Sequence, residues 1–119
     1  MLKILFIALL VLNFLTEALA ALSLITGPQG LSQAGSGEMW SMHYGFAALS
    51  IASLSVWAFF QRHNASAITV TLGTLLVFHT GVCFSLFAAA DQPAGMTIHA
   101  VLAVLCALLF FMRGRFTAA

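Results

Sequence analysis

The chain has 119 residues, of which 62% are hydrophobic and only 6% carry a formal charge. So few charged side chains cannot cover the surface of a water-soluble globule, and the length allows one compact domain. The net charge of +1 and the lack of any basic stretch interleaved with aromatic residues exclude a nucleic-acid partner. The composition therefore predicts an integral membrane protein that is surrounded by membrane lipid.

Four apolar runs, taken in chain order, predict membrane-spanning helices. A helix of about 20 residues rises about 1.5 Å per residue and crosses a hydrocarbon core of about 30 Å. Polar turns rich in Gly, Pro, Ser and Asn separate the runs, so neighbouring helices should be antiparallel. We expect an all-α, up-down-up-down four-helix bundle that forms a single transmembrane domain over residues 1–119. The predicted helices cover about residues 4–26, 41–60, 67–90 and 95–112.

The first run also has features of a secretory signal peptide. Ala18-Leu19-Ala20 resembles the small-x-small site at which such peptides are cleaved. The apolar run nevertheless continues to Thr26, which makes it about 23 residues long, whereas a signal core has about 7 to 15. A retained first helix is the favoured interpretation, and processing after Ala20 is the alternative.

The charged residues predict how the helices are oriented. All four basic residues flank the same side of the predicted helices, and they are Lys3, Arg62, Arg113 and Arg115. Glu38 and Asp91 lie in the two loops on the opposite side. Because Lys and Arg accumulate in cytoplasmic loops, both termini should be cytoplasmic.

Ionisable residues inside the predicted spans mark the candidate site. Counted along each helix, Glu17, His79 and His99 lie roughly 20 Å from the cytoplasmic end, and His43 lies about one turn nearer the outside. A polar group that faces lipid costs a few kcal/mol, so these side chains should point inward and meet. Glu17 is either a register-fixing hydrogen-bond partner or a proton carrier. The imidazoles are structural, or they ligate haem or a metal, or they donate to a quinone; His43 is a candidate entrance residue.

Small and polar residues predict where the helices touch. Small side chains let helix backbones approach closely in a membrane, and hydroxyls and amides bond across helices. The residues selected for this role are Asn13, Ser50, Gly73, Gly81 and Ser85. Cys83 and Cys106 lack metal-binding or haem-attachment spacing and differ in depth by roughly 15 Å, so we expect two unpaired, buried thiols. No motif predicts a metal site.

One family resemblance is present at the start of the second run. Gly27-Pro28 ends the first run, and Tyr44-Gly45-Phe46-Ala47-Ala48-Leu49 opens the second. With the order of four helices, this resembles small bacterial membrane proteins of the DoxX-like family. The resemblance implies a multi-pass protein of the bacterial inner (cytoplasmic) membrane with a role near quinone-dependent redox chemistry. The arginine-bearing, glycine-rich first helix of that family is missing here, so no family site residue is carried over.

Two functions remain open from the sequence. In the first, Glu17, His79, His99 and His43 form a redox- or proton-linked site for a quinone-like or other lipid-soluble ligand, or for a b-type haem. In the second, the chain is an accessory subunit of a larger membrane complex or a homo-oligomer, and its polar layer is purely structural. A transporter or channel has little support, because there is no internal repeat or broken span. Hydrolytic and nucleotide-driven motifs are absent, and whether the protein is an enzyme stays open.

Overall fold

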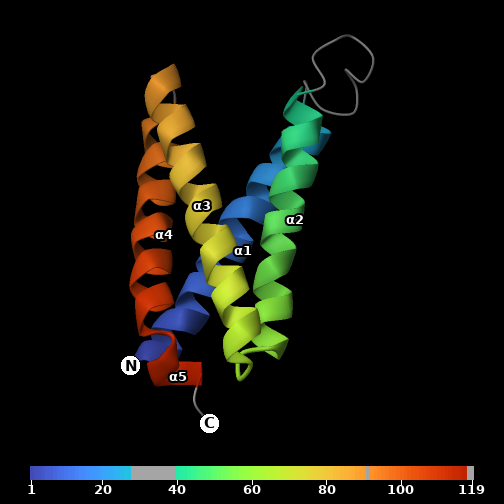
Figure 1. The fold of residues 1–119 in the computed structure, drawn as a ribbon. Coiled ribbons are helices and arrows are strands. Elements are labelled where there is room, and N and C mark those ends of the chain that lie inside the picture. Colours follow the sequence, from blue (N-terminus) through green and yellow to red (C-terminus); the bar gives the residue numbers. More distant parts are fainter. Residues whose placement is uncertain (28–39, 91, 118–119) are drawn as a thin grey trace. The chain divides into compact units, whose positions relative to one another are not determined.

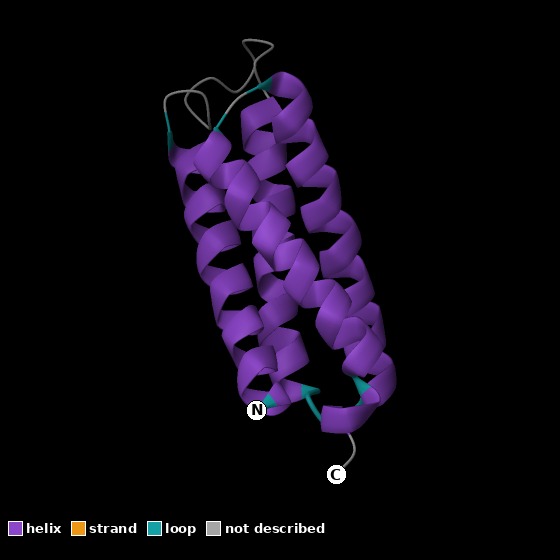
Figure 2. Ribbon diagram, turned by 90° about the vertical axis from the view of Figure 1, so that its left-hand side faces the viewer, coloured by secondary structure: helices purple, strands orange, loops and turns teal. Residues whose placement is uncertain are grey.

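The computed structural model describes residues 1–27, 40–90 and 92–117, and their regular structure is entirely helical (Figures 1 and 2). The helices are α1 (Leu2–Thr26), α2 (Trp40–Phe60), α3 (Ala65–Ala89), α4 (Pro93–Met112) and α5 (Gly114–Thr117). The four long helices contain 25, 21, 25 and 20 residues and are long and apolar enough to cross a membrane. The prediction of an all-α protein with four potential membrane spans is therefore confirmed.

The helix ends differ slightly from the predicted ones. Each long helix begins one or two residues earlier than expected, and α4 begins at Pro93, since proline suits the first helical position. The short helix α5 was not predicted, because its four residues are too few to carry a periodic pattern. Glu38 and Asp91, which define the outer side in the predicted orientation, lie outside the described residues.

The chain divides into two compact units. The first, called here the α3–α4 unit, comprises Met1–Leu9 and Ala58–Ala119. The second, called the α1–α2 unit, comprises Leu10–Trp57. Both buried histidines belong to the α3–α4 unit, and Glu17 belongs to the α1–α2 unit.

In the α3–α4 unit, α3 and α4 lie side by side along their length (Figure 1). A Cβ atom added to Gly95 at the start of α4 would lie 3.4 Å from Leu86, near the end of α3. One added to Gly73 of α3 would lie 3.6 Å from Phe110, near the end of α4. The start of α4 thus lies against the end of α3, and the end of α4 lies against the first half of α3. The two helices therefore form an antiparallel hairpin.

The turn before α3 is fixed by a helix cap. The Oδ1 atom of Asn64 accepts hydrogen bonds of 3.1 Å from the backbone N–H groups of Ser66 and Ala67. These two donors have no partner within the helix, so the cap satisfies them. The predicted tight turn therefore ends where α3 begins, which sets the register of the residues that follow.

The buried residues of α3 and α4 recur at alternating intervals of three and four. This spacing is that of a heptad seam, which keeps one stripe of a helix facing its neighbour. The apolar buried residues include Ile68, Leu72 and Leu75 on α3, and Leu102, Cys106 and Leu109 on α4. His79 and His99 occupy the same stripes, so the register that packs the leucines also places both imidazoles in the core.

In the α1–α2 unit, Gly45 lets the two helices approach closely. A Cβ atom at Gly45 would lie 2.7 Å from Cγ1 of Ile25 and 3.1 Å from Cβ of Leu24, both on α1. Nearby, the Ser41 hydroxyl donates to the Leu24 carbonyl at 3.4 Å. Only glycine fits here without displacing a neighbour, so Gly45 sets the distance between the helices at this point.

Candidate functional site

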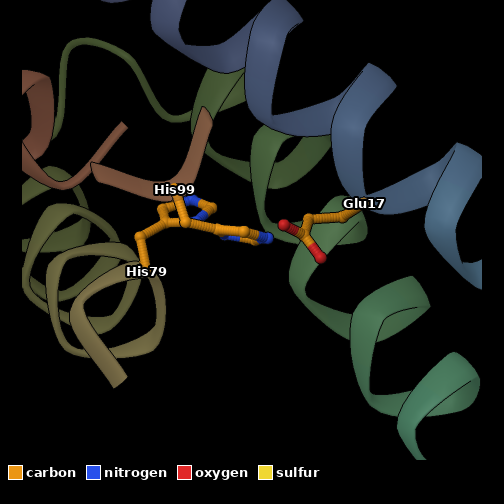
Figure 3. A group of neighbouring side chains, drawn as sticks. All are labelled: Glu17, His79 and His99. Atoms are coloured by element: carbon orange, nitrogen blue, oxygen red, sulfur yellow. The ribbon is translucent and has the colours of Figure 1, made fainter. Parts of the chain in front are cut away.

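His79 of α3 and His99 of α4 form a hydrogen-bonded pair within the α3–α4 unit. Both are buried, with exposed fractions of 0% and 7%. Their Nδ1 atoms are 2.9 Å apart and their ring centroids 5.2 Å apart, and the rings lie next to each other in Figure 3. A direct bond between imidazoles therefore joins the two helices.

The geometry of this bond fixes the hydrogen-bonding character of the pair. A neutral imidazole carries one proton, so one ring must donate its Nδ1–H and the other must accept at Nδ1. The donating ring then has an unprotonated Nε2, and the accepting ring has an Nε2–H. The pair can take up one further proton at the unprotonated Nε2 while the central bond persists. A second would set two N–H groups against each other, so the pair holds at most one extra proton.

Phe78 packs its ring edge-on against both imidazoles. Its ring centroid lies 5.3 Å from that of His79 and 6.2 Å from that of His99. The sequence alone does not distinguish Phe78 from the other phenylalanines, of which the chain has 11 in all. Its position immediately before a buried histidine was the available signal.

The separation of the two Nδ1 atoms bears on the haem hypothesis. Histidine usually binds haem iron through Nε2, whereas His79 and His99 meet through their Nδ1 atoms. While this bond persists, the two Nε2 atoms lie on the far sides of the rings, so the pair would not hold one iron ion between both imidazoles.

Glu17 is a fully buried carboxyl on α1, in the α1–α2 unit (Figure 3). Asn13, four residues earlier and on the same helix face, is also fully buried. Tyr44 of α2 lies within electrostatic range of Glu17. A carboxyl inside a membrane span is costly and in most cases functional, so Glu17 remains a candidate site residue.

Asn13 links α1 to α2 through its side-chain amide. Its Nδ2 donates to the Ser55 hydroxyl at 2.8 Å and to the Ile51 carbonyl at 3.3 Å. Ser50 of α2, which the sequence predicts as a helix-packing residue, is exposed and donates to the carbonyl of Phe46 on its own helix. Ser50 is therefore corrected as a packing residue, and Ser55 makes the cross-helix bond.

The other selected residues occupy varied positions. His43 was expected to point inward, and this is wrong: its side chain is exposed and lies edge-on to Trp40, with ring centroids 6.3 Å apart. Gly73 is half-buried, but Gly81 and Ser85 are exposed, and a Cβ atom on Gly81 would meet nothing within 4 Å. Of the three residues predicted to pack on α3, Gly73 is therefore partly covered by a neighbouring side chain. No described residue covers Gly81 or Ser85 closely enough to bury it.

Both cysteines are unpaired thiols in the described residues, as the depth count predicts. Cys106 is buried in the seam of α4. Cys83 is only half-buried, which corrects the expectation that both would be fully enclosed.

Comparisons of the chain with protein-family models, with curated proteins and with solved structures found no match. The resemblance to DoxX-like proteins therefore stays a prediction.

Proposed function

We propose that this chain is a multi-pass protein of the bacterial inner membrane in which Glu17, His79 and His99 act together as a proton-linked site for a quinone-like, lipid-soluble ligand. The observation that carries the proposal is the buried hydrogen bond between the two histidines. In such a pair one ring carries an Nε2–H, the kind of group that donates to a quinone carbonyl, and the other an unprotonated Nε2, the kind of group that accepts a proton.

Glu17 completes the proposed site as the group that exchanges a proton. The depth count from the sequence puts it at the same level as the two histidines, and its side chain is fully buried. A carboxyl and an imidazole are the common proton donors and acceptors of proteins. The resemblance to DoxX-like proteins, some of which are linked to quinones, points in the same direction.

Ligand binding tests this function. We expect the purified protein in detergent to bind one short-chain benzoquinone, measured by equilibrium gel filtration, with an affinity that changes with pH. Glu17→Gln keeps the size of the side chain and removes its titrating proton. That variant should therefore remain folded and lose most of the pH dependence, whereas Ser50→Ala, at an exposed position, should bind like the wild type.

Three results would refute the proposed function. The first is that the purified protein binds no quinone, and the second is that its absorption spectrum shows a Soret band. The third is that it retains a stoichiometric metal ion, since carboxylate and imidazole groups are also metal ligands. A double-mutant cycle between Glu17→Gln and His79→Leu checks whether the residues share a site. Independent effects on quinone binding and on stability would separate them.

The proposed membrane topology is an up-down-up-down bundle with both termini and Arg62 in the cytoplasm. The one-sided distribution of the four basic residues supports it. We expect an alkaline phosphatase fusion after Arg115 to be inactive and a green fluorescent protein fusion at the same point to fluoresce. Phosphatase activity in the periplasm would contradict the orientation, and cleavage after Ala20 would leave three spans.

A second candidate function is that of an accessory subunit. It is favoured by the exposed face of α3, on which Val77, Gly81 and Phe84 have large exposed fractions or open space around them. Small residues on such a face allow another helix to approach closely. Co-purification of a second membrane protein that is lost in Gly81→Leu would support this role.

A further inference from the structure

A pocket of about 280 Å³ at one end of the α3–α4 unit combines basic and aromatic side chains. Its basic lining residues are Lys3, Arg62 and His63. Its apolar lining residues are Phe6, Ile7, Phe59 and Phe116. All seven belong to the α3–α4 unit, and none has a part in the site proposed above.

The apolar part of the pocket is built by two stacked rings. The centroids of Phe6 and Phe116 are 5.1 Å apart with an interplanar angle of 30°, and both side chains are almost fully buried. Phe116 lies on α5, the short helix after α4. The turn that α5 makes therefore supplies one wall of the pocket.

The basic part of the pocket is held in place at Arg62. Its guanidinium lies 4.8 Å from the centroid of the Phe59 ring and donates to the Phe59 carbonyl at 3.0 Å. Lys3 and His63 line the same pocket. Arg62 is thus positioned by two contacts that leave its positive charge without neutralisation.

None of the described residues of this unit has a carboxylate side chain, because Asp91, the one acidic residue in its sequence, lies outside them. The basic lining groups therefore favour an anion from outside the described residues, and the phenylalanines next to them favour an apolar group.

We propose that this pocket binds an anionic membrane phospholipid, with the phosphate at Lys3, Arg62 and His63 and the start of an acyl chain against Phe6 and Ile7. Basic residues at the ends of membrane helices attract anionic lipid headgroups, and pockets between such helices bind them. A free phosphate ion shares the headgroup chemistry but makes no use of the phenylalanine wall. A phospholipid uses both parts of the pocket, with its phosphate at the basic residues and its acyl chain at the apolar ones.

Native mass spectrometry of the full-length protein tests this inference. We expect phosphatidylglycerol to be retained about tenfold more strongly than phosphatidylcholine, and the double substitution Lys3→Gln with Arg62→Gln to reduce its retention about tenfold or more. Arg115→Gln removes a charge that does not line the pocket and should retain the lipid like the wild type. Lys3→Gln with Arg62→Lys keeps one of the two charges and should be intermediate.

One more variant and one competitor distinguish a bound phospholipid from a bound phosphate ion. Ile7→Trp keeps every charge but fills the apolar part of the pocket, so it should also weaken retention of phosphatidylglycerol. Equal retention by wild type and by the folded double variant would overturn the proposal. Displacement of the lipid by an equal concentration of glycerol 3-phosphate would overturn it too, because it would show that the phosphate alone is recognised.

Discussion

Replacing His79 with leucine should destabilise the protein by about 1–3 kcal/mol, because it removes the hydrogen bond to Nδ1 of the buried His99. A buried polar group that loses a partner bears the full cost of its desolvation, whereas loss of an exposed bond is compensated by water. The free energy of unfolding can be measured in mixed micelles by titration with sodium dodecyl sulfate. His43→Leu is the matched control, since His43 is exposed, and it should change stability by less than about 0.5 kcal/mol.

The double variant His79→Leu with His99→Leu gives the sharper result. With both partners apolar, no imidazole is left buried without its bond, so the loss of stability should be smaller than the sum of the two single losses. We expect a coupling free energy of about 0.5–3 kcal/mol. Additive losses would show that the two side chains do not interact, and the pair would then have no place in a site.

Gly45→Leu should disrupt the packing of α1 on α2. A Cβ atom there already lies 2.7 Å from Ile25, and a leucine adds three further carbon atoms. Overpacking of this kind costs about 1–3 kcal/mol, and more where the backbone cannot move. The unfolding free energy, measured as above, should fall by at least this amount.

Gly81→Leu is the control for that experiment, because a Cβ atom on Gly81 meets nothing within 4 Å. Both substitutions replace a helical glycine and gain about the same helix propensity, up to about 1 kcal/mol. The difference between them therefore reports packing alone. Equal stability of the two variants would contradict the close approach of α1 and α2 at Gly45.

The membrane spans could be predicted because only length and mean hydropathy matter for them. The buried face of each span could not be predicted from apolar periodicity, because lipid is as apolar as the protein core and all sides of the helix look alike. Ser50 was predicted as the packing serine of α2, whereas Ser55 makes the bond to α1. Both are serines in an apolar helix, and only the register with Asn13 distinguishes them.

Three of the four ionisable residues in the spans were the exception, because an ionisable side chain that faces lipid carries a large free-energy cost; His43 is exposed instead. Glu17, His79 and His99 are all buried, as the cost of facing lipid requires. That the two histidines meet through their Nδ1 atoms could not be derived, since it depends on side-chain rotamers and on helix register to within about an ångström. The same limit applies to the pocket that Phe116 of α5 helps to form.

The bond between His79 and His99 would also restrict the direction of any proton transfer through the pair. A proton that enters at the unprotonated Nε2 of one ring pushes the shared proton across to the other ring, whose own Nε2–H then leaves. The two rings have then exchanged tautomers, so the unprotonated Nε2 is now on the other ring. The next proton must therefore enter at that other ring, unless both rings first rotate. Such a rotation would first have to break the bond between the two Nδ1 atoms. The pair is therefore suited to handing a single proton back and forth between two partners, and unsuited to sustained proton flow in one direction.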